Sequence, residues 1–499
     1  MPEPIVRLDP AAARVEEFGD WVDPLDALAA AGDRGHPVLL LSGQPDHPAA
    51  RHSILAADPI LVCDLRGDRA RLARRDGGAW REEIRTVADP FELIRDLAPA
   101  GPAPRAAAGL PFVGGAIGWL GYGLRHAVER LPERAPDPLG HPVLWLGVYD
   151  AAVIFDHRER RVALVTAGLR AAGGTDGSPA GGEAAARRPG EWRRLLERAR
   201  TAGHDGRKEP HGSPDPGGFD GAAPGPMPGV RFAVSRDRYL AQVRRALQDI
   251  AAGDVYQVNL SHRITCLCPA LPLPLFVRLA RRNPAPFAAY LDTGDLQVLC
   301  TSPERLVSLR GDRVVSSPIK GTRPRFGDPA ADERLRAELR DSPKDRAENV
   351  MIADLVRNDL GRVCKPGSVR VETLCGLESF ATVHHLVSTI AGTLRADRDR
   401  VDLLRALFPG GSMTGAPKVR AMEIIDELEQ EERGIYSGSI GYLSADGSID
   451  FNIVIRTAVC SGGLAHFRVG GGVVADSDPE AEWRETLDKA RALLDVFGG

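Results

Sequence analysis

The chain has 499 residues and a net charge of −4, from 64 lysines and arginines against 68 aspartates and glutamates. This near balance argues against a protein that binds nucleic acid through bulk positive charge. Seven cysteines with no Cys-x-x-Cys pair argue against a disulfide framework or a zinc site, and the N-terminus lacks the apolar core of a signal peptide. We expect a cytoplasmic protein without a nucleic-acid or membrane partner, and length alone suggests about two or three domains.

Composition divides the chain into three parts. Residues 1–170 form an N-terminal part, whose glycine-rich stretch at 106–124 suits tight turns beside strands. Residues 171–228 are dominated by Gly, Pro, Ala, Arg and Asp, and have few large apolar side chains to offset the entropy of ordering. We predict a mobile linker or insertion there, in which residues 192–199 have the pattern of a short amphipathic helix.

The third part, residues 229–499, shows hairpin signals alternating with helical patterns. Apolar residues three and four apart predict a helix that Ser235 caps and Gly253 ends. Gly311-Asp312 and Asp446-Gly447 each lie between strand-like segments, which is typical of a β-hairpin. Antiparallel hairpins with interleaved helices predict an α+β fold and not a doubly wound sheet. The expected strands are 305–309, 314–317, 439–444 and 449–459, and the expected helices are 342–358, 417–431 and 479–496.

Two of these helices carry paired acids. Glu482 and Glu485 lie three residues apart on the last helix, and Asp345 and Glu348 have the same spacing on another. Two helix faces that offer carboxylates suit Mg²⁺, which takes one or two carboxylates together with water and an anionic ligand. The alternative is a set of solvated surface acids, with Glu485 paired to Lys489 one turn further on.

A glycine-rich segment, residues 409–418, leads into the helix expected at 417–431. Gly410 and Gly415 have the spacing of a phosphate-binding loop, but Ala416-Pro417 stands where that motif requires lysine, so we reject this motif. Free N–H groups at such a turn suit an anion such as a carboxylate. An ordinary capped helix is the alternative.

Lys320 stands close to Arg323 and Arg325 at the end of the first hairpin. Neighbouring cations and some burial would lower the pKa of this lysine and favour its nucleophilic amine. A three-residue hairpin loop would place Lys320 opposite Glu304 on one face, whereas a two-residue loop would separate them. The alternative is a solvated lysine at a strand end. His385, in an apolar run, is either a general acid–base group or a satisfied core residue.

Together and in this order, these motifs resemble those of the chorismate-utilising enzymes. The similarity covers nearly all of the chain from residue 232 onward, with weaker pieces at 111–124 and 283–287, whereas residues 171–228 match nothing in the family. The matching stretches are GDVYQVNLS (253–261), SPERL (302–306), PIKGTRPR (318–325), ENVMIADLVRNDLGRV (348–363), VHHLVS (383–388), FPGGSMTGAPKVRAMEIIDELE (408–429), YSGSIGYL (436–443), FNIVIRT (451–457) and GGGVVADSDPEAEWRETLDKA (470–490).

The resemblance implies a fold and a site. The fold would be a large α/β sandwich with two curved antiparallel sheets and flanking helices, built by residues 1–170 and 229–499 as one domain with the linker as an insertion. The resemblance implies Lys320, Glu304 and His385 as catalytic residues, Glu348 and Glu485 as Mg²⁺ ligands with Asp345 and Glu482 nearby, and Gly321, Thr322, Thr414, Tyr436, Arg456, Gly472 and Lys489 as substrate-binding residues.

Two positions bear on which family reaction the chain would perform. Water-adding members have a lysine base where this chain has Gln257, and an amide cannot take a proton from water. Members that aminate chorismate at C4 usually have a lysine before the Gly-Thr pair, as Lys320 stands here, whereas those that aminate at C2 usually have alanine. The resemblance therefore implies amination at C4 through Lys320, with amination at C2 as the alternative.

The same resemblance implies chorismate as substrate and a second subunit as partner. Because the sequence has no Gly-x-Cys-x-Gly nucleophile turn, ammonia would come from a separate glutamine amidotransferase subunit. A third hypothesis is a non-catalytic amino-acid-binding scaffold. The effector-pocket element at 283–287 is intact, but the element at 39–42 has Leu where regulated members have Glu. The retained acids, with His385 and Lys320, argue against a dead enzyme.

Overall fold

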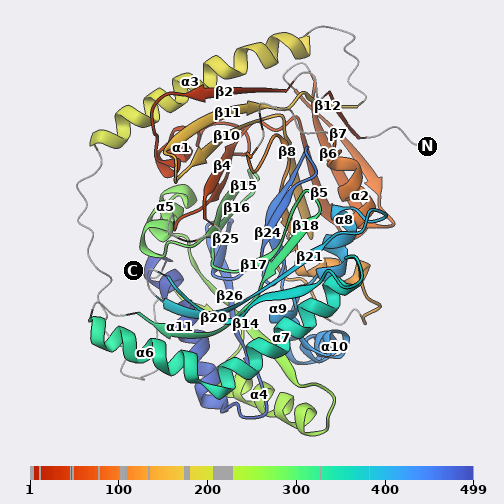
Figure 1. The fold of residues 1–499 in the computed structure, drawn as a ribbon, viewed down its shortest axis with the longest axis vertical. Coiled ribbons are helices and arrows are strands. Elements are labelled where there is room, and N and C mark those ends of the chain that lie inside the picture. Colours follow the sequence, from red (N-terminus) through yellow and green to blue (C-terminus); the bar gives the residue numbers. More distant parts are fainter. Residues whose placement is uncertain are drawn as a thin grey trace.

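Strands from both ends of the chain combine into two large antiparallel sheets with helices around them, as Figure 1 shows. Each sheet contains strands of the N-terminal part beside strands of the C-terminal part, so the two parts form one sandwich and the length-based expectation of two or three domains is wrong. The predicted α+β class with two antiparallel sheets is confirmed. The computed structural model describes residues 5–9, 13–44, 47, 50–76, 79–101, 107, 109–132, 135–172, 180–205, 229–325, 328–380 and 383–497.

The first sheet joins the two parts of the chain where β15 pairs with β3. Its 12 strands include the short β22, which pairs with β14 beside the main path. In spatial order the strands are β13 (Arg231–Phe232), β14 (Gln257–Leu267), β26 (Leu464–Val473), β25 (Thr457–Ser461), β16 (Leu296–Ser302), β15 (Phe287–Asp292), β3 (Val38–Leu41), β4 (His52–Ala56), β10 (Ala151–Asp156), β11 (Arg161–Thr166) and β2 (Arg14–Phe18), with β22 at Gly415–Ala416.

The second sheet joins the two parts where β23 pairs with β8. It also has 12 strands, and β20 pairs with β21 beside the main path. In spatial order they are β19 (Ile319–Pro324), β21 (Val383–Thr393), β18 (Arg313–Ser317), β17 (Arg305–Arg310), β24 (Ile449–Asn452), β23 (Ser439–Ser444), β8 (Gly115–Leu120), β9 (Leu144–Tyr149), β5 (Leu61–Arg66), β6 (Arg69–Asp76) and β7 (Ala79–Thr86), with β20 at Arg370–Ser379; β1 (Val6–Leu8) and β12 (Leu169–Ala171) form a separate pair.

Apolar side chains from both sheets fill the space between them. Trp119 on β8 stacks on Trp145 of β9 with ring centroids 5.4 Å apart. Val38 and Ile54 of the first sheet belong to the same buried cluster. Burial of each such side chain contributes about 1.5–3 kcal/mol, so this shared interior ties the two parts of the chain into one body.

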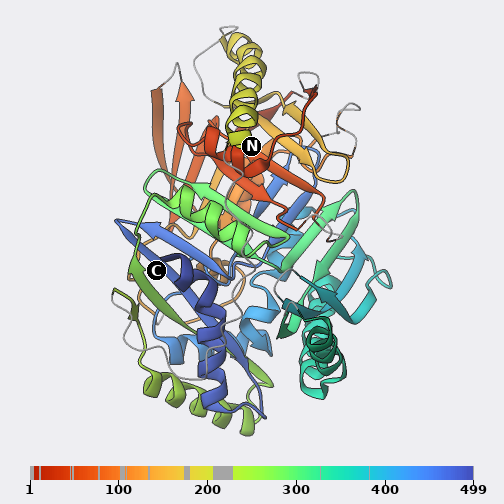
Figure 2. The ribbon, with the colours of Figure 1, turned by 90° about the vertical axis from the view of Figure 1, so that its left-hand side faces the viewer.

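Helices cover the outer faces of the sandwich and gather at one end of it. Figure 2 shows α4 and α11 together at the end of the molecule opposite to α3. Ser235 caps α4 as predicted, accepting a hydrogen bond from the Arg238 amide. The helices are α1 (Pro24–Ala30), α2 (Pro90–Leu97), the 3-10 helix η3 (Tyr122–Ala127), α3 (Ala180–Asp205), α4 (Arg236–Ala251), α5 (Pro272–Arg282), α6 (Pro329–Asp341), α7 (Pro343–Gly361), α8 (Arg400–Leu407), α9 (Gly411–Thr414), α10 (Lys418–Glu429) and α11 (Pro479–Phe497).

Part of the expected linker is a helix. Residues 180–205 form α3, which lies against α1. Its buried stripe of Trp192, Leu195 and Leu196 belongs to the cluster under the first sheet. The predicted piece at 192–199 supplies this stripe, and the helix extends beyond it in both directions. The rest of the expected linker, 173–179 and 206–228, lies outside the described residues.

The strand expected at 449–459 is two strands. β24 ends at Asn452 in the second sheet, and β25 begins at Thr457 in the first. Between them the chain passes from one sheet to the other, with Arg456 in a left-handed conformation at φ 50°. The sequence alternation continues through this crossing, which is why periodicity alone does not reveal it.

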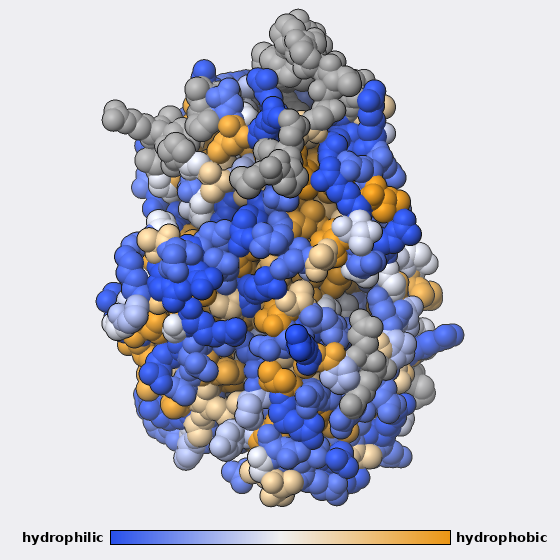
Figure 3. All heavy atoms as spheres, turned by 90° about the vertical axis from the view of Figure 1, so that its right-hand side faces the viewer, coloured by the Kyte–Doolittle hydropathy of each residue, from blue (hydrophilic) through white to orange (hydrophobic). Residues whose placement is uncertain are grey.

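The surface carries no single dominant apolar face in the view of Figure 3. Hydrophilic side chains cover most of that side, and apolar ones lie between them in small groups. Within the described ranges, no helix is both long and apolar enough to cross a membrane.

Candidate functional site

Two segments of the chain that cross from one sheet to the other lie side by side, and each carries one charged residue. The chain leaves β16 for β17 through Glu304, and leaves β24 for β25 through Arg456. The two crossings are hydrogen-bonded to each other, from the Ile453 amide to the Glu304 carbonyl at 3.0 Å and from the Thr301 amide to the Arg456 carbonyl at 3.1 Å. The carboxyl of Glu304 and the guanidinium of Arg456 are thereby fixed where both sheets meet.

Glu304 is buried, with 3% of its surface exposed. Its Oε1 accepts hydrogen bonds from Ser412 Oγ at 2.8 Å and from the Ile319 amide at 3.3 Å. Burial nevertheless raises the pKa of this carboxyl, because it outweighs those bonds and the nearby Lys320 ammonium. Glu304 therefore holds a proton more readily than a solvated carboxyl does, as a general acid requires.

Lys320 lies on β19 with its amine beside the same serine. Its Nζ donates to the Ser412 carbonyl at 3.3 Å. A Cβ on Gly472 would lie 3.3 Å from this Nζ and 2.0 Å from the Gln257 Nε2, so the amine and the amide both lie over the glycine backbone of β26. Burial lowers the pKa of Lys320 although Glu348 and Glu304 oppose the shift. The side chain is thus suited to supply a neutral amine.

Of the two expected causes of that shift, burial is confirmed and the charges of the two arginines are not. Arg323 forms an ion pair with Glu338 at 2.8 Å, and Arg325 pairs with Asp332 at 3.2 Å. Their charges are matched outside the site, whereas burial and the Lys489 ammonium act on Lys320. Sequence proximity places the two arginines on the same strand segment but does not give their direction.

The hairpin has the second of the two loop lengths considered, the one that separates Glu304 from Lys320. Arg310 pairs with Arg313, so the loop has two residues, and a bulge between Arg305 and Ser308 shifts the register of β17. Glu304 and Lys320 are therefore not a cross-strand pair. They come together because Glu304 lies in the crossing between sheets and both side chains contact Ser412.

His385 and Gln257 present unpaired polar atoms. His385 Nδ1 lies 2.9 Å from Thr322 Oγ1 and 3.3 Å from the Gly321 carbonyl, which can only accept. This assigns the proton to Nδ1 and leaves a lone pair on Nε2. Burial, with the Arg456 charge, lowers the pKa of His385 to about 3. Among the described residues, neither its Nε2 nor either amide atom of buried Gln257 has a hydrogen-bond partner. Such atoms are costly unless a ligand satisfies them.

The acids of α11 border the same glycine strand, and Glu348 of α7 is close enough to act on Lys320 through its charge. A Cβ on Gly471 would lie 2.8 Å from Glu482 Oε2 and 3.6 Å from Glu485 Oε1. Glu482 is buried; its Oε1 accepts from Ser477 Oγ at 2.6 Å, and its Oε2 has no partner in the described part of the chain. Burial raises the pKa of Glu482 and of Glu348. Buried carboxylates without matching cations suit a hard metal ion.

Lys489 contacts Glu485, which is the alternative to a metal ion at that carboxylate. It forms an ion pair with half-exposed Glu485 at 2.6 Å and donates to the Gly470 carbonyl at 2.8 Å. The expected alternative of a Glu485–Lys489 pair is therefore present, and this partly exposed pair lies against the site glycines. Within the described ranges, no three His, Cys, Asp or Glu side chains are grouped closely enough to hold a metal ion by themselves. Mg²⁺ at Glu348 and Glu485 would need water and ligand oxygens as well, which is its usual preference.

The remaining expected residues lie around these groups. Asp345 pairs with Arg323 at 3.2 Å, and its charge contributes to the raised pKa of Glu348. Thr414, on α9, is fully buried and donates to the Gly410 carbonyl at 3.3 Å. Tyr436 is buried, with the Arg433 guanidinium carbon 5.8 Å from its ring.

Sequence reasoning missed Ser412 as a separate contributor. Its hydroxyl serves Glu304 and its carbonyl serves Lys320, yet nothing in the glycine-rich segment distinguishes it from its neighbours. Arg433 was also missed, because a lone arginine after a helix carries no spacing signal.

Comparisons with known proteins give a family, similar sequences and a similar fold. Residues 44–495 match the family described as chorismate binding enzyme. Aminodeoxychorismate synthase component 1 of Klebsiella aerogenes is 41% identical over 460 residues, covering 92% of this chain and 92% of that protein. Anthranilate synthase component 1 of Streptomyces coelicolor is 43% identical over 482 residues, covering 96% and 87%. The crystal structure of anthranilate synthase component I from Streptococcus pneumoniae has a TM-score of 0.70 at 29% identity, covering 89% of this chain and 92% of that one.

Proposed function

Because this chain belongs to the family of chorismate binding enzymes, we propose that it aminates chorismate at C4, as an aminodeoxychorismate synthase component I. The product is 4-amino-4-deoxychorismate, which leads to 4-aminobenzoate and folate. Ammonia comes from a separate glutamine amidotransferase subunit. The designation component 1 of the relatives supports a second subunit.

Lys320 is the residue that favours amination at C4 over amination at C2. Relatives named for the two amination reactions are 41% and 43% identical, so overall similarity does not separate the reactions. In the site, the Lys320 amine lies beside Gln257, and burial lowers its pKa. A buried neutral amine at this position has a chemical use in covalent catalysis, which the alanine usual in the C2-aminating members lacks.

The proposed reaction uses two displacements. The Lys320 amine forms a bond to C2, the two conjugated ring double bonds each shift by one position toward C4, and the C4–O bond breaks while Glu304 gives its proton to the oxygen, which leaves as water. Ammonia then adds at C4, the double bonds shift back, and Lys320 departs from C2 as a neutral amine. The new C4 ammonium returns a proton to the Glu304 carboxylate. The lone pair on His385 Nε2 is available to orient the C4 hydroxyl.

Charged groups around the acid and the amine bind the substrate carboxylates. Arg456 has no carboxylate within ion-pair distance among the described residues, and burial lowers its pKa to about 10, so it stays charged. We assign one carboxylate to Arg456 and Tyr436, and the other to Lys489 and the Gly472 backbone.

The acids fit a metal ion. Glu348 and Glu485 would hold Mg²⁺, and the unpartnered Oε2 of Glu482 supports a cationic ligand nearby. When bound, the ion neutralises part of the charge of the dianionic substrate. Lys489 would then lose Glu485 as its partner and be free to contact a carboxylate.

The decisive experiment identifies the product. The purified protein is incubated with chorismate, Mg²⁺ and an ammonium salt, and products are separated and identified by mass and retention. We expect 4-amino-4-deoxychorismate, which yields 4-aminobenzoate when a lyase is added, and no 2-aminobenzoate. Formation of 2-aminobenzoate alone would overturn the proposal. A no-ammonium control separates amination from addition of water.

Amination at C2 is the second candidate. The 43% identity to an anthranilate synthase component 1 over 482 residues favours it. Under this alternative Lys320 is only a charge partner, and replacing it with alanine would leave the rate of amination largely intact.

A further inference from the structure

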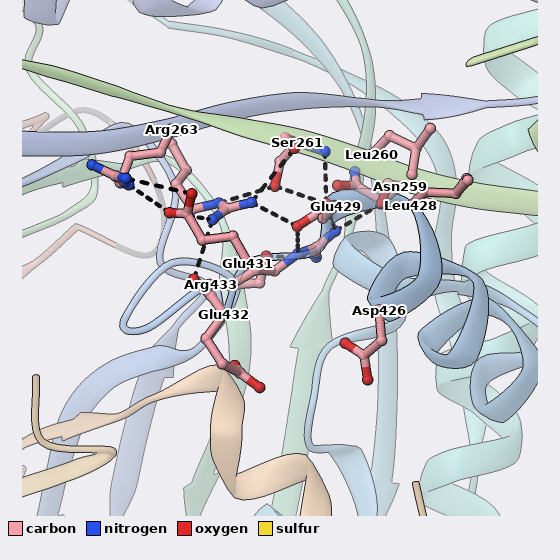
Figure 4. A network of polar contacts seen from close by, with 12 residues as sticks. Asn259, Leu260, Ser261, Arg263, Asp426, Leu428, Glu429, Glu431, Glu432 and Arg433 are labelled. Atoms are coloured by element: carbon pink, nitrogen blue, oxygen red, sulfur yellow. Dashed lines mark hydrogen bonds and ion pairs between the residues drawn. The ribbon is translucent and has the colours of Figure 1, made fainter. Parts of the chain in front are cut away.

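Arg433 lies outside the reacting groups, at the centre of a buried polar network (Figure 4). It follows α10 and is 4% exposed. Its guanidinium makes two hydrogen bonds to Glu429, at 2.6 and 3.0 Å. It also donates to the Met413 carbonyl at 2.7 Å, to the Asn259 carbonyl at 2.7 Å and to Ser437 Oγ at 3.0 Å. Three of its five hydrogen bonds therefore go to uncharged acceptors.

Those three acceptors belong to three segments that carry the site. Met413 lies between Ser412 and Thr414 on α9. Asn259 lies on β14, two residues beyond Gln257, and Ser437 directly follows Tyr436. One rigid, planar guanidinium thus joins a strand, a glycine-rich turn and the tyrosine segment.

The orientation of this guanidinium is itself fixed. Glu429 accepts from the Ser261 amide at 2.8 Å, from Ser261 Oγ at 2.9 Å and from Arg468 at 2.7 Å. Figure 4 shows the Glu429 carboxylate against β14, with Arg433 beside it. Because these contacts hold the Glu429 carboxylate in place, the two hydrogen bonds from Arg433 to it fix the plane of the guanidinium and the direction of its remaining donors.

We propose that Arg433 is a positioning residue, which sets the place of α9 and thereby the distance between Lys320 and Glu304. The bond to the Met413 carbonyl fixes the backbone next to Ser412. Ser412 in turn contacts Lys320 through its carbonyl and Glu304 through its hydroxyl. This inference rests on the proposed function for the roles of those two groups.

The main test is Arg433→Lys, with Arg125→Lys as the matched control. Arg125 is 1% exposed and belongs to the same region, but its side-chain bonds go to carboxylates of Asp426 and Glu432. Chorismate consumption per folded molecule is measured with Mg²⁺ and ammonium, whichever product the wild type forms. We expect kcat to fall about 100-fold for Arg433→Lys, with KM for chorismate within about threefold, because misplacement of reacting groups has costs of this size. Arg125→Lys keeps the wild-type kcat.

A second measurement separates positioning from stability. Guanidinium ion at millimolar concentration should raise kcat of Arg433→Ala severalfold, because it can occupy the vacated place. A variant that is merely destabilised would gain no activity, since guanidinium does not stabilise folded structure. If Arg433→Ala does not fold, Ser437→Ala is compared with Ser261→Ala, and only the first should lower kcat.

The proposal is overturned if Arg433→Lys and Arg125→Lys have equal kcat per folded molecule. Absence of rescue in folded Arg433→Ala, or equal kcat in the two serine variants, would also overturn it. The product formed by wild type tests the proposed function separately, because the kcat ratios do not depend on which carbon is aminated.

Discussion

Two buried groups of charged residues in the C-terminal part differ in the direction in which the pKa of their carboxyl is shifted. In the first, Glu429 is matched by Arg433 and Arg468; burial disfavours its carboxylate, but the two arginines outweigh burial and hold its pKa below the usual range. In the second, burial raises the pKa of Glu304 and lowers that of Lys320. A matched carboxylate stays charged and fixes its neighbours, whereas unmatched groups move toward neutrality and can exchange protons.

The largest expected effect comes from removing the unmatched amine. Lys320→Ala should lower formation of 4-amino product at least about 10⁴-fold, because the covalent route is lost. Any residual reaction should place nitrogen at C2. Product analysis and rates on the folded variant give the measurement.

Lys320→Arg is the matched control, since it keeps a cation that is not nucleophilic at neutral pH. Near-normal 4-amination by either variant would contradict the covalent mechanism. Intact mass measurement of the wild type with chorismate and no ammonia should show an adduct on Lys320.

The acids of the site should give the next largest effect. Glu485→Gln removes a proposed metal ligand and should lower turnover about 10³-fold without unfolding the protein. Circular dichroism checks the fold, and a Mg²⁺ titration of the wild type after chelation should restore activity. Glu480→Gln, on the first turn of the same helix, is the control. Normal turnover of Glu485→Gln in the presence of chelator would remove the metal from the reaction.

The sequence predicts the two groups of charged residues to different extents. The motif order leads to the family, and hairpin and helix signals lead to the fold class and most C-terminal elements. The crossings at Glu304 and Arg456 are not predictable from alternation, because side chains keep alternating while the chain changes sheet. The Glu429 network is missed because Ser261 on β14 and Arg468 on β26 are far from Glu429 in sequence.

Removing the counter-charge of the matched group should lower stability. Glu429→Gln leaves two buried arginines without their shared counter-charge and should lower the free energy of unfolding by about 3–5 kcal/mol at pH 7. Because the folded pKa of Glu429 lies below its ordinary 4.5, its contribution is complete above that pH and declines as pH falls through the folded value.

Urea unfolding between pH 7 and pH 3 tests this. The stability difference between wild type and Glu429→Gln should shrink toward the acidic end. Glu423→Gln on the same helix is the control, because its ion pair with Arg420 is one-third exposed and should contribute under about 1 kcal/mol. A difference that grows on acidification would show that the folded carboxylate is not held below its usual pKa.

The smallest expected effects come from the same substitution, serine to alanine, made once in each group of charged residues. This allows the most direct comparison of the two groups. Ser261 and Ser412 are both buried, and each donates its hydroxyl to a carboxyl, that of Glu429 at 2.9 Å and that of Glu304 at 2.8 Å. Ser261→Ala should lower the free energy of unfolding by about 1–2 kcal/mol and leave kcat unchanged, because Glu429 keeps its two arginines and the Ser261 amide. Ser412→Ala should lower kcat about 10-fold, because it frees the carboxyl that must deliver a proton to the departing oxygen. Urea unfolding and steady-state rates on both variants give the measurement. If Ser261→Ala lowered kcat as much as Ser412→Ala does, the matched charges would be part of the reacting group and the division between the two groups would fail.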